Sequence, residues 1–282
     1  MARFTRAQVR RRQRTAIAIL VVLVLTVVGS CTVLLLRPGR DDDQAPSRDA
    51  SGNNAVMTVP AVPAAAPIRD QLPDGIEAGA DEAIGIDVSA HQKQIDWTAA
   101  AADGVTFAYI KATEGSGHTD SQFAANWTGA RDAGVTVGAY HYFTLCSPGA
   151  EQAADFLATA PPDDSALPPA LDLEFDGACD ERPEADHAEQ EIAAFLKAVE
   201  RAGGRRAVIY SSREWRSHYG LSVAEGRPDW LFSDSGRPSQ EDWAVWQLRF
   251  DGRVAGIDGP VDIDVLRVEV LREKARLDQG DG

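Results

Sequence analysis

The 282-residue sequence has only five histidines. After its first fourteen residues it also has far fewer lysines and arginines than aspartates and glutamates. The five histidines show no H-x-x-H or H-x-x-x-H spacing, which argues against the zinc-dependent hydrolases that use such spacings. The first fourteen residues hold six arginines and no acid, so residues 15–282 net −21 within a chain total of −15. A surface this acidic repels phosphates, so we expect no nucleic-acid partner.

Cysteine is scarce as well, with three in the chain. Cys31 lies inside an apolar run, whereas Cys146 and Cys179 each follow a predicted strand. An even pair of cysteines in an exported domain favours a disulfide bond, and two free thiols are the alternative.

One long apolar run is present. Residues 15–36 read TAIAILVVLVLTVVGSCTVLLL and contain no charge, which is long enough for a helix to span a bilayer. The arginines of residues 1–14 predict a cytoplasmic tail, with the rest of the chain outside. We therefore expect a single-pass anchor in the plasma membrane. A cleaved signal peptide followed by secretion is the alternative.

Residues 37–82 are rich in Pro, Ala, Gly, Asp and Ser, and their large apolar side chains follow no helix or strand period. This composition predicts a flexible, disordered linker without secondary structure. A folded domain is expected over residues 83–270, followed by a tail over residues 271–282.

Within the folded domain, short apolar strands alternate with helices that end at glycines. This alternation implies parallel strands joined by right-handed crossovers. After Tyr210 the rhythm changes to the short strand-like segments DWLF, WAVWQLRF, RVAGI and VDIDVL. The sequence therefore predicts the α/β class and an irregular (β/α) TIM-like barrel. A doubly wound open sheet is the alternative.

Two acids, Asp172 and Glu174, stand inside the apolar run LDLEF. Residues two apart on a strand point to the same side, so both acids face away from the leucines. A buried pair of like charges raises the pKa of one partner. One protonated and one ionised carboxyl are what acid-assisted cleavage of a glycosidic bond requires. Acids that reach solvent or pair with an arginine are the alternative.

More polar residues stand where the predicted strands end. The carboxyl ends of parallel strands line the ligand site of α/β folds, so these residues favour a binding or catalytic site. They are Asp87, Lys111 to Glu114, His141, Tyr210, Gln247 and Asp262, in addition to Asp172 and Glu174.

An ordered set of motifs over residues 83–266 resembles the family-25 glycoside hydrolases, the Chalaropsis-type lysozymes. The motifs are GIDVSAHQ, IDW, FAYIKATEG, AGVTVGAYHYF, LPPALDLE, VIYSS, WQ and GPVDID. The resemblance implies hydrolysis of the β-1,4 bond between N-acetylmuramic acid and N-acetylglucosamine in peptidoglycan. Peptidoglycan glycan strands and the membrane are then the expected partners. We expect a monomer without a cofactor or a metal, and a non-catalytic glycan-binding barrel is the alternative.

The resemblance also implies roles for individual residues. Glu174 matches the general acid, Asp172 its partner, and Asp87 and Asp262 the remaining acids of the site. Candidates for contact with sugar are Tyr140, His141, Tyr210, Trp246 and Gln247. A wall position for His141 and a core position for Trp246 remain open, as does the choice between retaining, inverting and substrate-assisted hydrolysis.

Other residues are expected to shape the site. Lys111 and Glu114 are expected to pair with each other. Two departures from the family pattern affect loops: Lys93 stands where glycine is common, and DWLFSDSG replaces a segment that usually leads to a tyrosine.

Overall fold

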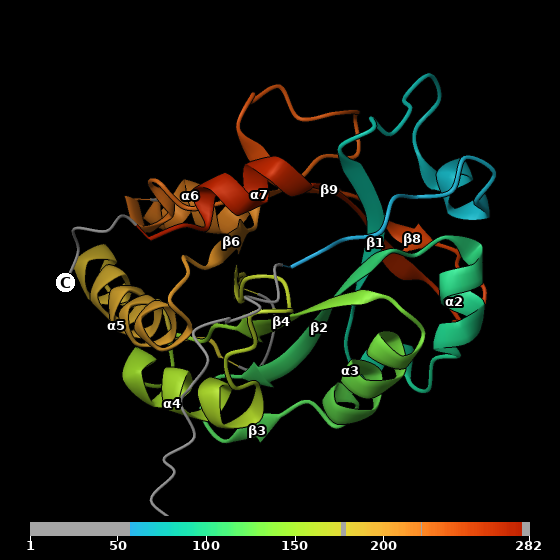
Figure 1. Cartoon of the computed structure of the whole chain (residues 1–282). Helices are drawn as coiled ribbons and strands as arrows, with labels where there is room; N and C mark the ends of the chain where they lie inside the picture. The colour runs from blue at the N-terminus through green and yellow to red at the C-terminus, as the bar shows by residue number, and fades with distance from the viewer. Residues whose placement is uncertain (1–56, 176–178, 221, 278–282) are drawn as a thin grey trace, which may run out of the picture. The chain divides into compact units, whose positions relative to one another are not determined.

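The computed structural model describes residues 57–175, 179–220 and 222–277 (Figure 1). The predicted cytoplasmic tail, the predicted transmembrane helix and the first part of the predicted linker lie outside these residues. Across the described ranges, no helix combines the length and the apolar character needed to cross a bilayer.

The strands form one sheet that closes into an eight-stranded barrel, because β1 pairs with both β2 and β9 (Figure 1). The order around the barrel is β1-β9-β8-β7-β6-β5-β4-β2, and β3 pairs with the outer end of β2. The predicted barrel is confirmed and the open sheet is not formed. The strands are β1 (Glu82–Val88), β2 (Phe107–Glu114), β3 (His118–Thr119), β4 (Thr136–Tyr142), β5 (Ala170–Leu173), β6 (Val208–Ser211), β7 (Asp229–Phe232), β8 (Trp243–Gly252) and β9 (Val261–Arg267).

Helices cover the outside of the barrel (Figure 1). Sequence signals set their ends: Asp96 accepts a hydrogen bond from Ala99 N at the start of α2, and Gly104 ends that helix with a φ of 109°. Such a left-handed conformation suits glycine. The α-helices are α2 (Trp97–Asp103), α3 (Phe123–Asp132), α4 (Gly149–Thr159), α5 (Ala185–Gly203), α6 (Arg213–Tyr219) and α7 (Val268–Lys274), and the short 3₁₀ helices are η1 (Pro67–Gln71), η2 (Ala90–Gln92) and η3 (Ser222–Ala224).

Two apolar cores hold these layers together. The larger core contains residues that face the helices, such as Leu171 and Phe195. The second core contains Phe107, Tyr109 and Leu266, which alternate along their strands with members of the first core. Because strand residues alternate between faces, we place this second core inside the barrel, which is filled by side chains and is not a pore.

The last strand differs from the prediction. Residues 253–257 were expected to form a strand, but they lie in the turn between β8 and β9. β9 runs antiparallel to both of its neighbours. The connection over residues 253–260 is too short for the crossover that a parallel pair requires. As a result, the start of β9 lies at the face of the barrel where the parallel strands end.

The predicted flexible linker is wrong for its second part. Residues 57–81, which we call the N-terminal strap, pack on the barrel and include η1. Its buried side chains include Met57 and Ile68, and Ile68 has no exposed surface. The strap is also fixed through its backbone, since Arg272 donates to Met57 O at 2.7 Å and Thr136 donates to Thr58 O at 2.8 Å. The apolar residues of the strap are irregularly spaced, so the sequence shows no helix or strand period there. Met57 and Ile68 are nevertheless buried against the barrel.

We expect Ile68→Val to lower the free energy of unfolding by about 1 kcal/mol, because it removes one methylene group from a closed packing site. Ile76→Val, at a partly buried position of the same strap, is the matched control and should cost less. Urea unfolding followed by tryptophan fluorescence measures both. Equal losses for the two variants would contradict the close packing of Ile68.

Candidate active site

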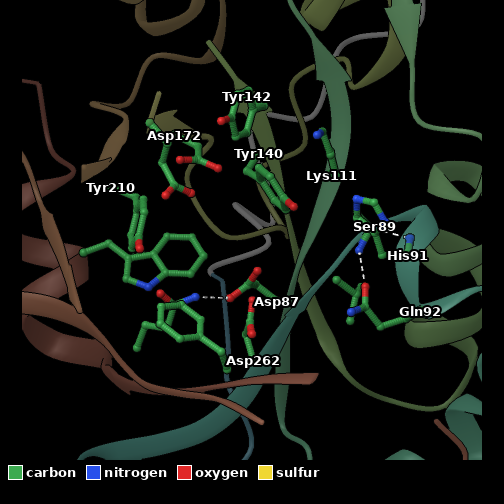
Figure 2. A pocket seen from close by; sticks show the side chains of 15 residues that line it. Asp87, Ser89, His91, Gln92, Lys111, Tyr140, Tyr142, Asp172, Tyr210 and Asp262 are labelled. Atoms are coloured by element: carbon green, nitrogen blue, oxygen red, sulfur yellow. Dashed lines mark hydrogen bonds between the residues drawn. The ribbon is translucent and has the colours of Figure 1, made fainter. Parts of the chain in front are cut away.

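A pocket with a volume of about 210 Å³ opens at the carboxyl ends of the parallel strands (Figure 2). Asp87 enters it from β1, Asp172 from β5 and Asp262 from the start of β9, while Glu174 follows the end of β5. The structure therefore brings together the four acids that sequence reasoning selected. Tyr140, Tyr210 and Gln247 of the predicted sugar contacts also line the pocket.

Asp172 and Glu174 face the same cavity because strand residues alternate. Leu171 and Leu173 have no exposed surface and pack in the core under the helices, which leaves the acids on the inner side. Burial raises the pKa of Asp172 well above its usual value, and the neighbouring charge of Glu174 adds to that effect. Two buried carboxyls in one cavity do not both ionise readily, because the charge on one raises the pKa of the other.

Asp87 and Asp262 form a second acidic pair, across the β1–β9 ladder in which they are register partners. Gln247 Nε2 donates to Asp87 Oδ2 at 2.9 Å. Burial is the main cause of the raised pKa of Asp87, followed by the charge of Asp264. Burial and the charge of Asp87 raise the pKa of Asp262 to about 9.

Asp264 is a fifth acid that sequence reasoning missed. It has no exposed surface, and Trp230 Nε1 donates to its Oδ1 at 2.9 Å. Burial raises its pKa, and the charge of Asp262 contributes. A signal was present in the segment VDID, because a strand that turns Asp262 inward also turns Asp264 inward. Asp264 lies behind the pocket, and its charge is one of the causes that raise the pKa of Asp87.

Two tyrosines, Tyr140 and Tyr210, line the pocket on the two sides of Asp172 (Figure 2). Burial raises the pKa of Tyr140 and of Tyr210 above the usual value, and nearby carboxylates, Asp87 and Asp172 among them, strengthen the effect. Both phenols therefore keep their protons and present hydrogen-bond donors to the cavity. Trp230, which also lines the pocket, contacts Tyr210 edge to face at 5.5 Å.

His141 was predicted to bind substrate, with a wall position as the alternative, and the structure places it away from the residues that line the pocket. Its side chain has no exposed surface and lies in the helix-facing layer, stacked on Phe195 at 4.7 Å. Thr113 Oγ1 and Gln152 Oε1 hydrogen-bond its two ring nitrogens at 2.7 and 2.9 Å. Burial lowers the pKa of His141 to about 4, so the ring is neutral. The alternation of β4 explains the position, because Tyr140 and Tyr142 take the inner side.

Trp246 was also predicted to contact sugar, and it too lies outside the pocket. It is fully buried in the core under the helices, and its Nε1 donates to Ser233 O at 2.9 Å. Its neighbour Gln247 faces the cavity instead. The outcome follows from strand alternation: of two adjacent residues, one faces the pocket and the other faces the core.

The remaining wall of the pocket carries a cation and a fixed loop. Lys111 Nζ lies 2.6 Å from Glu114 Oε2, as expected, and 4.6 Å from the centre of the Tyr142 ring. Ser89 and Gln92 form a capping box around η2. Lys93 follows with a φ of 58°, a conformation that explains why glycine suits this position.

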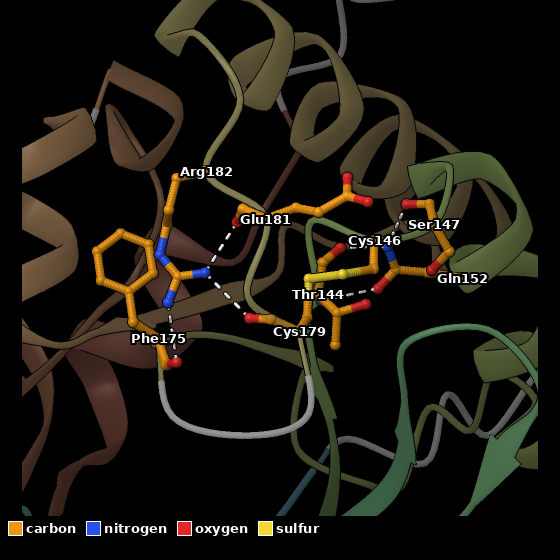
Figure 3. The surroundings of a disulfide bond; sticks show 8 residues. All are labelled: Thr144, Cys146, Ser147, Gln152, Phe175, Cys179, Glu181 and Arg182. Atoms are coloured by element: carbon orange, nitrogen blue, oxygen red, sulfur yellow. Dashed lines mark hydrogen bonds between the residues drawn. A yellow bond between two sulfur atoms is a disulfide. The ribbon is translucent and has the colours of Figure 1, made fainter.

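The predicted disulfide bond is confirmed between Cys146 and Cys179 (Figure 3). It joins the loop after β4 to the segment that follows β5. Arg182 supports the same segment: its guanidinium lies 4.1 Å from the centre of the Phe175 ring and donates to the carbonyl oxygens of Phe175 and Cys179. Phe175 is the residue directly after Glu174, so these contacts hold the chain on which Glu174 stands.

Replacing Asp262 by asparagine should change how stability depends on pH. In the native protein Asp262 has a pKa of about 9 and keeps its proton below that pH. In the unfolded chain an aspartate has a pKa of about 3.9 and loses its proton above that pH. Between these values the native state binds more protons, so stability falls as pH rises through that window. The Asp262→Asn variant lacks this titration.

We therefore expect the free energy of unfolding of Asp262→Asn to fall less than that of the parent between about pH 5 and about pH 9. Urea unfolding across this range measures the difference. Asp258→Asn, at an exposed position of the preceding turn, is the control and should follow the parent. A parallel course for the parent and Asp262→Asn would disprove the expected linkage.

Comparisons with known proteins agree with this geometry. The model of the family described as "Glycosyl hydrolases family 25" matches residues 86–257. The chain is 30% identical to lysozyme M1 of Streptomyces globisporus, over 90% of this chain and 91% of that protein. It is 34% identical to the uncharacterized protein YegX of Escherichia coli K12, over 69% of this chain and 73% of that one.

Solved structures are similar as well. A family 25 glycosyl hydrolase from Bacillus anthracis superposes with a TM-score of 0.61 at 31% identity, covering 69% of this chain and 90% of that chain. The bacterial lysozyme from Streptomyces coelicolor gives a TM-score of 0.61 at 32% identity, covering 68% of this chain and 96% of that chain.

Proposed function

Because this chain belongs to glycosyl hydrolase family 25 and is a muramidase-type glycosidase, we propose that Glu174 is its general acid. The bond cleaved is the β-1,4 linkage from N-acetylmuramic acid to N-acetylglucosamine in peptidoglycan. The observation that carries the proposal is the placement of Asp172 and Glu174 in one pocket with two more acids, where burial and the charge of Glu174 raise the pKa of Asp172. Acid-assisted cleavage needs a carboxyl that is still protonated at neutral pH.

Glu174 is the member of the pair suited to donate the proton. It stands just beyond the end of β5, with a side chain one methylene longer than that of Asp172. Its protonated carboxyl gives the proton to the glycosidic oxygen as the bond from that oxygen to the anomeric carbon breaks. Asp172 keeps a negative charge next to the positive charge that develops on the sugar. Water then adds to the anomeric carbon, and its proton returns to the carboxyl pair.

The other acids and the tyrosines hold the substrate and regulate charge. Asp87 and Asp262 both have raised pKa values, so the pocket carries fewer negative charges than it has carboxyl groups. Protonated carboxyls and the phenols of Tyr140 and Tyr210 donate hydrogen bonds to sugar hydroxyl and acetamido oxygens. Gln247 orients Asp87 through its 2.9 Å hydrogen bond.

The proposal includes the place of action. The charge-free segment at residues 15–36, with arginines before it, supports a single-pass anchor and a catalytic domain outside the cytoplasm. The substrate is then the peptidoglycan that lies next to the membrane in which the chain is anchored. Cell fractionation of the producing organism checks this location, and recovery of the protein mainly from the culture medium would favour secretion.

The test of the activity is incubation of residues 57–282, which include the strap, with purified peptidoglycan. The new reducing ends are reduced with borohydride and identified after acid hydrolysis. We expect reduced muramic acid. Reduced glucosamine would show a glucosaminidase instead, and absence of new ends would contradict the proposed hydrolysis.

A further inference from the structure

The ribbon formed by β8 and β9 carries an exposed aromatic side chain beside the acidic pocket. Phe250 is 52% exposed and is the only large apolar side chain of the described residues with such exposure. It stands inside the second of two irregularities of the β8–β9 ladder, which run from Gln247 to Arg249 and from Arg249 to Gly252. Such bulges redirect side chains and often occur next to functional sites.

Phe250 is held by a second ring. Phe232, from the end of β7, stacks on it with ring centres 4.3 Å apart and an angle of 24° between the planes. Phe232 is half-buried against the interior core. It is also the register partner of Gln247. One face of Phe250 is therefore supported, while the side chain remains half exposed.

This pair lies at the rim of the pocket. Phe250 lines the cavity together with Gln247, Trp230 and Asp262. The cavity measures about 210 Å³, which is less than the roughly 300–1,000 Å³ of sites that enclose a drug-sized ligand. A glycan strand is longer than such a ligand. Sugars on either side of the cleaved bond must therefore continue over the rim.

Resting on the proposed function, we propose that the Phe232–Phe250 platform is an outer sugar subsite for the glycan strand. The flat face of a pyranose ring presents C–H groups, and the face of an aromatic ring carries the partial negative charge that attracts them. The position favours a sugar over a lipid surface, because Phe250 lines the same pocket as the four acids that act on the glycan in the proposed function. The preformed stack also lowers the ordering cost of binding.

The experiment compares the binding of two ligand lengths. Calorimetry measures the affinity of the full chain for a peptidoglycan-derived disaccharide and for an octasaccharide, in a Glu174→Gln background that slows cleavage. Phe250→Ala should weaken octasaccharide binding about threefold to tenfold, the usual size of one aromatic contact. Disaccharide binding should change less than twofold. Phe250→Trp should bind the octasaccharide as tightly as the parent, whereas Phe250→Leu should bind it as weakly as Phe250→Ala.

The matched control is Arg253→Ala, at an exposed position just after the same strand that does not line the pocket. Equal octasaccharide affinity for Phe250→Ala and its parent would overturn the subsite. Parent-like octasaccharide affinity of Phe250→Leu would also overturn it, because it would show an apolar contact without stacking. Loss of binding to phosphatidylcholine vesicles with unchanged glycan affinity would assign the platform to a lipid surface. The calorimetric titrations measure binding and do not depend on cleavage of the glycan. They therefore test the subsite even if the unmutated chain releases no reducing ends, and failure of the proposed hydrolysis can be told apart from failure of the subsite.

Discussion

Replacing Glu174 by glutamine lowers kcat on peptidoglycan by about 10²- to 10⁴-fold, the usual contribution of a positioned general acid. Glutamine has nearly the same shape but no proton to give. The glutamine amide can also donate a hydrogen bond to a neighbouring carboxylate, so we expect the fold and substrate affinity to persist. Release of reducing ends under saturating substrate measures kcat.

Glu181→Gln is the matched control, because this acid follows in the same segment and its side chain is exposed. It should keep the parent rate. A Glu174→Gln variant that retains more than about a tenth of the parent rate would remove Glu174 from the role of general acid. We would then expect Asp172→Asn to show the larger decrease in kcat.

Removal of the Cys146–Cys179 disulfide by the double variant Cys146→Ala and Cys179→Ala should cost about 3–4 kcal/mol of unfolding free energy. The bond closes a loop with a sequence separation of 33, and cross-links of this size restrict the unfolded chain by about that amount. Activity should fall together with stability, because the bond fixes the segment that follows Glu174. Urea unfolding and the rate of reducing-end release measure the two effects.

Reductant supplies the internal control for this prediction. Dithiothreitol should bring the parent close to the double variant in stability and should leave the double variant itself unchanged. If the double variant unfolds at the same urea concentration as the oxidised parent, the disulfide does not contribute to stability. If only its activity falls, the bond acts on the site without holding the fold.

Much of the site was predictable because one rule governs it. Alternation along a strand placed Asp172 and Glu174 together, and polar residues at strand ends located the pocket. The same rule, applied to single residues, corrects two predictions. His141 follows Tyr140 and Trp246 precedes Gln247, so in each pair only one side chain faces the cavity.

Other features depend on tertiary contacts that a local pattern does not contain. The antiparallel direction of β9 follows from a connection too short for a crossover, and it decides that Asp262 reaches the pocket from the start of its strand. The packing of Phe250 on Phe232 joins residues on two strands through a bulged ladder. The strap resembled a linker because its apolar residues lack a period, although Ile68 is fully buried.

The N-terminal strap also determines where mechanical load enters this domain. Met57 packs with residues near the starts of β1 and β2, and the carbonyl of Thr58 is bound by Thr136 at the start of β4. A pull on the chain before Met57 is therefore taken up at the amino ends of the strands, through the strap's hydrogen bonds and buried side chains. The catalytic acids lie at the opposite, carboxyl ends of the strands, so the length of the barrel separates the pocket from the point where such a pull enters.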